Sequence, residues 1–133
     1  METEYTPIFN DSFQRCTGDP DFLDRFYRIF LSSSEEVKAK FSHTDMQLQK
    51  KIMLKSLAYM VHANINPASI HKTAINHDKH HLNIAPHFYE LWLDSMIQAV
   101  EQTDPCFNEK VAQAWRETLQ PGINHMIKQY HAS

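Results

Sequence analysis

Apolar residues recur at helical spacing along nearly the whole chain. Phe22, Phe26 and Phe30 stand four residues apart, so on a helix they would share one face. Comparable stripes occupy residues 8–16, 53–61, 88–100 and 111–130. The pattern predicts an all-α protein in which each helix buries one apolar stripe.

Capping residues and prolines divide these stripes into about seven helices. A short polar side chain before the first turn can accept hydrogen bonds from backbone N–H groups, and proline fits the first turn itself. Pro121, in contrast, falls inside the last stripe, where its missing N–H predicts a kink. The expected starts and caps are Asp19-Pro20, the serines at 32–34, Thr44 with Gln47, Asn66-Pro67, Pro86 and Asp104-Pro105.

Composition supports the same fold class. The chain of 133 residues has only two glycines, Gly18 and Gly122, whereas sheet proteins use many glycines in tight turns. The length predicts a single domain that covers residues 1–133. A domain of this size buries enough surface to fold without a disulfide or a structural metal.

Charge and cysteine content exclude several classes of protein. The net charge is −3, and the densest basic run, residues 49–51, suits the solvated edge of an amphipathic helix, so no nucleic-acid partner is expected. No apolar run is long enough for a membrane span, and the acidic N-terminus does not resemble a signal peptide. The isolated Cys16 and Cys106 fit a reducing compartment, so we expect a cytoplasmic protein.

Four of the nine histidines, at positions 77, 80, 81 and 87, gather around the start of an aromatic-rich stretch. His77 and His81 are four residues apart and could face one metal ion from a single helix, but a zinc site needs more ligands and neither cysteine is near. The cluster follows a helical segment and precedes a helix that begins at Pro86. A single imidazole in that place suits a haem ligand.

In the order and spacing of these features, the sequence resembles the globins, and most closely the small single-domain bacterial globins. DFLDRFYRIFLSSSEEVKAKF (21–41) is similar to the globin segment in which an aromatic pair is followed by the phenylalanine that packs on haem. QKKIMLKSLAYM (49–60) resembles the distal helix, and AWRETLQPGINHMIKQY (114–130) the final helix. NHDKHHLNIAPHFYELWLDSMIQAV (76–100) is similar to the proximal histidine, its loop and the next helix. The resemblance covers nearly the whole chain and implies a globin fold around a haem pocket, with heme b as the cofactor.

The resemblance also implies that one histidine ligates the haem iron. Related globins carry it about ten residues before the tyrosine that matches Tyr89, but here that position is Lys79. His77 stands twelve residues before Tyr89, and His80 and His81 stand nine and eight before it, so the loop has a different length. We favour His77, because it follows in the helical register of the preceding residues, with His80 and His81 as alternatives.

On the distal side, Tyr27 matches the tyrosine that in many bacterial globins donates a hydrogen bond to bound oxygen. A one-residue choice of register leaves two pairs over the iron, Gln49 with Met53 or Leu48 with Ile52, and the apolar stripe favours Gln49 with Met53. The resemblance places further side chains in the pocket wall, where ordinary core packing is the competing interpretation. These are Phe41, Ile84, Phe88, Tyr89 and Trp92.

The resemblance implies a protein that binds O2 reversibly, with NO and CO as further gas ligands. The alternative is a globin-like sensory or protein-interaction module without haem. No Rossmann fingerprint is present, so any nitric-oxide dioxygenase activity would need a separate reductase, and we expect no enzyme in this chain alone. Fold by itself decides neither the function nor the oligomeric state.

Overall fold

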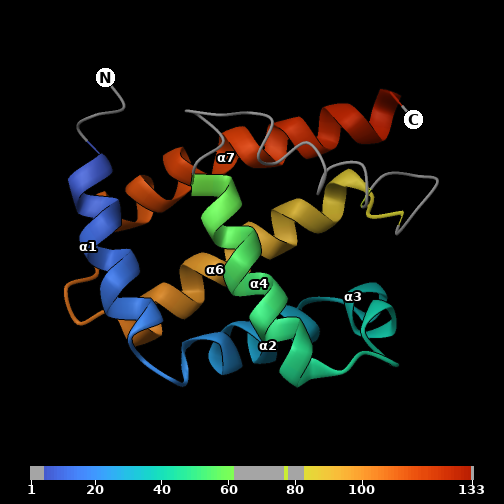
Figure 1. The fold of residues 1–133 in the computed structure, drawn as a ribbon, viewed down its shortest axis with the longest axis horizontal. Helices are drawn as coiled ribbons and strands as arrows, with labels where there is room; N and C mark the ends of the chain where they lie inside the picture. Colours follow the sequence, from blue (N-terminus) through green and yellow to red (C-terminus); the bar gives the residue numbers. More distant parts are fainter. Residues whose placement is uncertain (1–4, 62–76, 78–82, 133) are drawn as a thin grey trace. The chain divides into compact units, whose positions relative to one another are not determined.

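The computed structural model describes residues 5–61, 77 and 83–132, and this part of the chain contains six α-helices and no strand (Figure 1). The all-α prediction is therefore confirmed. The helix expected after Asn66-Pro67 lies outside the described residues. The six helices are α1 (Thr6–Thr17), α2 (Phe22–Ser33), α3 (Glu35–Lys40), α4 (Met46–Val61), α6 (Pro86–Thr103) and α7 (Glu109–Ala132).

The chain divides into two compact units. The first comprises Met1–Thr44 and Leu91–Thr118, and the second comprises Asp45–Glu90 and Leu119–Ser133. Helices α6 and α7 therefore contribute to both units, whereas α1, α2 and α3 belong to the first and α4 to the second.

The first unit is built around Trp115, which is completely buried. The centroid of its ring lies 4.8 Å from that of Phe9 in α1 and 6.2 Å from that of Phe22 in α2. Both phenylalanines are 1% exposed. Large aromatic side chains bury much apolar area each, so this cluster joins three helices that are distant in sequence.

In the second unit, α4 and α7 bury non-aromatic apolar side chains. α4 buries Met53 and Leu57, which are four residues apart, and α7 buries Ile123 and Met126, which are three apart. Each pair occupies one face of its helix, as the apolar stripes predicted. Pro121 lies inside α7, two residues after the helix enters this unit.

Two predicted helix boundaries are confirmed. α2 ends at Ser33, and the Ser34 hydroxyl caps α3 by accepting a hydrogen bond from the backbone N–H of Val37 at 3.1 Å. α6 begins at Pro86, where the lack of an N–H costs no helical hydrogen bond.

Three other predicted starts are wrong. α2 begins at Phe22, with Asp21 as its N-cap, rather than directly after Asp19. The Asp19 carboxylate accepts from the N–H of Asp21 and from Arg25 in the turn before the helix. The Asp45 carboxylate, and not the Thr44 hydroxyl, caps α4: it accepts from the N–H groups of the second and third residues of the helix, at 3.1 and 3.3 Å.

The start of α7 was also predicted wrongly. The helix begins at Glu109, and the side chain of Asn108 caps it by accepting from the N–H of Val111 at 3.0 Å. Asp104, which was expected at this start, is 3% exposed and bonds to residues of α1 instead. Among the described helices, none is long and apolar enough to cross a membrane.

Candidate functional site

Tyr27 and Phe41 lie side by side in the first unit. α2 buries Phe26, Tyr27 and Phe30, and Tyr27 is only 3% exposed. After the short helix that Ser34 caps, the chain brings the Phe41 ring back against α2. Its centroid lies 5.9 Å from those of Tyr27 and Phe30, edge to face in both cases. The fold thus places a buried phenol beside a half-buried aromatic ring.

Trp92 belongs to the same aromatic group. Its ring lies 6.0 Å from that of Phe26 in an edge-to-face arrangement, and the Phe26 ring lies 4.8 Å from that of Tyr27. Trp92 is 8% exposed, so it is part of the core of this unit. Three predicted pocket residues therefore belong to one aromatic group: Tyr27 and Trp92 both meet the Phe26 ring, and Phe41 meets the Tyr27 ring.

In the second unit, the burial of the α4 side chains distinguishes the two residue pairs that were candidates for the distal side. Met53 is 8% exposed and Gln49, one turn earlier, is half-buried. Leu48 and Ile52 are instead 54% and 47% exposed. Residues four apart share one face of a helix, so the face with Gln49 and Met53 turns inward and the face with Leu48 and Ile52 turns to solvent.

His77 and Ile84, both half-buried, are joined by a backbone hydrogen bond. The Ile84 N–H donates to the carbonyl oxygen of His77 across 2.9 Å. Asn83, directly before Ile84, has a φ of 54° and so adopts the left-handed conformation. The alternatives His80 and His81 lie outside the described residues.

Phe88 and Tyr89 are buried on the first turn of α6. Among the described residues, the Tyr89 hydroxyl is buried and has no hydrogen-bond partner. Burial raises the pKa of Tyr89, so this hydroxyl keeps its proton at neutral pH. A buried donor without an acceptor is costly, and such an atom indicates a place where a further group can bind.

Each unit, taken by itself, carries side chains of the kind that line cofactor pockets. The first unit provides the aromatic surfaces of Tyr27, Phe41 and Trp92, and the second provides the half-buried amide of Gln49 and the half-buried imidazole of His77. Over the described parts of the chain, no group of three or more His, Cys, Asp or Glu side chains could hold a bare metal ion. A haem iron would not require such a group, because a single imidazole can hold it.

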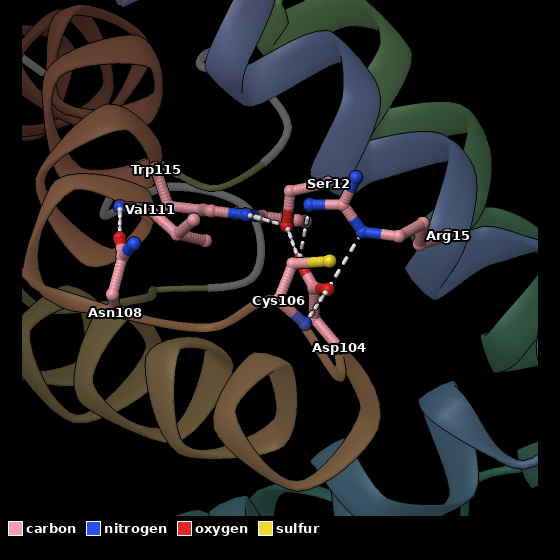
Figure 2. Close-up of polar contacts among 7 residues, drawn as sticks. All are labelled: Ser12, Arg15, Asp104, Cys106, Asn108, Val111 and Trp115. Atoms are coloured by element: carbon pink, nitrogen blue, oxygen red, sulfur yellow. Dashed lines mark hydrogen bonds and ion pairs between the residues drawn. The ribbon is translucent and has the colours of Figure 1, made fainter.

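A second polar cluster, which the sequence analysis missed, lies in the first unit (Figure 2). Arg15 of α1 donates from Nε and Nη2 to the two carboxylate oxygens of Asp104, at 2.6 and 2.9 Å. The Ser12 hydroxyl donates to Oδ2 at 2.6 Å, and the Cys106 N–H donates to Oδ1 at 2.8 Å. The indole N–H of Trp115 donates to the Ser12 oxygen at 2.9 Å. The cluster thus joins α1 to the connection between α6 and α7 and to α7 itself.

This cluster is structural rather than catalytic. Burial alone would raise the pKa of Asp104, but the Arg15 guanidinium, the Ser12 hydroxyl and the Cys106 N–H outweigh burial and lower it. The carboxylate therefore makes a poor base. Burial, together with the nearby Asp104 charge, raises the pKa of the Cys16 thiol to about 12, so that this thiol is no nucleophile at neutral pH.

One solved structure is similar to this chain over almost its full length. It is a protein from Pseudomonas aeruginosa described as structurally highly homologous to a human hemoglobin. The two sequences are 30% identical, the TM-score is 0.92, and the match covers 95% of this chain and 98% of the other. No protein-family model matches the sequence, and no curated protein is significantly similar to it.

Proposed function

We propose that this chain, which belongs to the same globin-like family as the Pseudomonas aeruginosa protein, binds haem and through it O2, NO or CO. The observation that carries the proposal is this near-full-length similarity to a hemoglobin-like structure at 30% identity. The aromatic group of Tyr27, Phe41 and Trp92 and the half-buried His77 supply side chains of the required chemistry.

His77 is the proposed ligand of the haem iron. A neutral imidazole is a common protein ligand of haem, and the bound iron supplies a coordination position at which diatomic gases bind and leave. The backbone of His77 is held by Ile84, and its side chain is half-buried, so the imidazole is partly shielded from water.

Tyr27 is the proposed donor to the gas ligand. A phenol hydroxyl can donate a hydrogen bond, and a hydrogen bond is stronger in a buried, low-dielectric pocket. Phe41, whose ring meets Tyr27 edge to face, would pack on the macrocycle. Gln49 and Met53, on the inward face of α4, complete the proposed distal side.

The remaining proposed pocket residues exclude water. Phe88 and Trp92 are buried apolar surfaces, and Ile84 is half-buried beside the loop of His77. The buried Tyr89 hydroxyl has no acceptor among the described residues and would gain one from a bound group. Exclusion of water lowers the local dielectric and so strengthens each polar contact in the pocket.

The competing proposal is a haem-free sensory or interaction module of the same fold, since fold and function are not tied to each other. Titration of the purified apoprotein with hemin distinguishes the two. We expect saturable uptake of one hemin per chain with a sharp Soret band, and a further shift when the reduced complex binds CO. A protein that takes up no hemin would instead be the module.

The ligand assignment needs its own variants. In His77→Gly, we expect the spectrum of the reduced complex to change and added imidazole to restore it, because free imidazole can occupy the vacated ligand position. His87→Ala is the matched control, since His87 lies in the same histidine-rich stretch but is exposed. If the spectrum is unchanged in His77→Gly but changed in His80→Ala or His81→Ala, then the iron ligand is His80 or His81.

A further inference from the structure

Asn83 and Ile84, which lie shortly before α6, bond to the last helix and to His77. The hydroxyl of Tyr130 in α7 donates to the side-chain Oδ1 of Asn83 across 3.1 Å. The next residue, Ile84, donates its N–H to the His77 carbonyl across 2.9 Å. All four residues belong to the second unit, so these contacts form one continuous connection from α7 to the proposed iron ligand.

Asn83 has an unusual backbone at the centre of this connection. Within the described ranges, it is the only residue other than glycine with a positive φ. The left-handed conformation costs most residues roughly 1–2 kcal/mol, and asparagine tolerates it better than most because its short amide can bond locally. Asn83 is exposed, and the bond from Tyr130 is a side-chain contact that favours this conformation over others.

We propose that Tyr130 and Asn83 are positioning residues for His77. Tyr130 holds the Asn83 amide, and this contact fixes the left-handed turn. The turn then directs the Ile84 N–H to the His77 carbonyl, so that the main chain bearing the imidazole cannot shift. The inference rests on the proposed function of His77 and adds to it the residues that set the position of the imidazole against the iron.

The geometry predicts a specific pattern among substitutions. Tyr130→Phe removes the donor, and Asn83→Gly removes the acceptor while it keeps the left-handed backbone accessible. Asn83→Asp keeps an acceptor oxygen at the same place. The double variant Tyr130→Phe/Asn83→Gly should be no worse than the more affected single variant, because both single changes break the same hydrogen bond.

The experiment uses the full chain reconstituted with hemin and has two readouts. One is the iron–imidazole stretching band of the reduced complex in resonance Raman spectra, and the other is the rate at which hemin transfers to an excess of apomyoglobin. We expect Tyr130→Phe and Asn83→Gly to shift or broaden the band and to speed hemin loss by about three- to tenfold, as the loss of one neutral hydrogen bond allows. Asn83→Asp should stay near wild type, as should Tyr5→Phe, a control in the other unit.

The outcomes separate this inference from the one it rests on. If the wild-type protein takes up no hemin, or if His77→Gly keeps the stretching band, then His77 is not the ligand and both proposals fail. If His77→Gly loses the band but Tyr130→Phe changes neither the band nor the rate of hemin loss, the positioning role alone is wrong. A lower melting temperature of the hemin-free Tyr130→Phe protein, with both haem readouts unchanged, would likewise overturn it in favour of a purely structural contact.

Discussion

Adjacent residues of α2 have different neighbours, and this difference bears on the proposed gas pocket. The Phe26 ring contacts that of Trp92, whereas the Tyr27 ring contacts that of Phe41. A helix turns by roughly 100° per residue, so two neighbours on one helix point in different directions even when both are buried. Phe26 therefore has the position of a core residue, and Tyr27 lies beside the residue expected to pack on haem.

Removal of the Tyr27 hydroxyl tests its role as donor. Tyr27→Phe keeps the ring and its contacts with Phe26 and Phe41, so packing should survive. A hydrogen bond to a partly charged oxygen in a dry pocket is worth about 1.5–3 kcal/mol, which corresponds to roughly ten- to a hundredfold in the rate of O2 release. Bound CO carries less negative charge, so its release should change much less.

Stopped-flow release of both gases from the two proteins provides the measurement, and CO serves as the internal control. An equal small change for O2 and CO would show that Tyr27 only packs. In that case Gln49, which is half-buried on the inward face of α4, becomes the next candidate donor.

At the scale of helices, the sequence predicted where apolar faces lie better than where helices begin. Phe26, Met53 and Met126, one from each of three stripes, are buried as expected, because burial follows from a period that local sequence displays. The start at Asp104 was wrong, because this carboxylate bonds to Ser12 and Arg15 of α1 instead of capping a helix. A capping motif does not show whether a carboxylate will bond to the nearby helix or to a residue that is distant in sequence.

The candidate site likewise contains residues whose position the sequence predicted and residues whose position it did not. A buried Tyr27 and the inward face of Gln49 and Met53 follow from helical period. The contact between Tyr130 and Asn83 spans 47 residues, and the left-handed Asn83 lies in a connection without a repeating pattern. Sequence period therefore predicts the helical parts of the site, while loop conformation and long-range hydrogen bonds require the structure.

The cap of α4 offers a direct test of one corrected prediction. Asp45→Ala should lower the free energy of unfolding by about 1 kcal/mol, because it removes the acceptor of the N–H groups of Gln47 and Leu48. Thr44→Ala is the matched control, since the capping motif in the sequence assigned this role to Thr44. Urea unfolding of the two variants decides between them: a larger loss in Thr44→Ala would restore the original prediction.

At the scale of the whole molecule, a network of long-range hydrogen bonds outside the proposed haem site stabilises the first unit. Ser12 and Arg15 bond to Asp104 across 92 and 89 residues of sequence, and Trp115 completes the network (Figure 2). The network is confined to the first unit and joins its first helix to its last. The partners of this buried carboxylate favour its ionised form, so its protonation should weaken the network.

Asp104→Asn should therefore destabilise the protein in a manner that depends on pH. Removal of a buried, hydrogen-bonded charge next to its partner typically costs about 2–4 kcal/mol, and we expect a loss of this size at pH 7. The pKa of Asp104 is lowered in the folded protein, against an unfolded value of about 3.9. The contribution of ionised Asp104 to the free energy of unfolding is thus complete above the unfolded pKa, and it is lost as the pH falls through the folded pKa.

The gap in unfolding free energy between wild type and Asp104→Asn should accordingly be widest near neutral pH and should narrow below about pH 4. Asp94→Asn is the matched control, because Asp94 pairs with Arg116 at 3.6 Å but both side chains are largely exposed, at 62% and 49%. Exposed pairs contribute little, so this variant should stay close to wild type at every pH. Denaturant unfolding at a series of pH values measures both gaps. A gap for Asp104→Asn that is as wide at pH 3 as at pH 7 would mean that the shape of the side chain, and not its charge, secures α1.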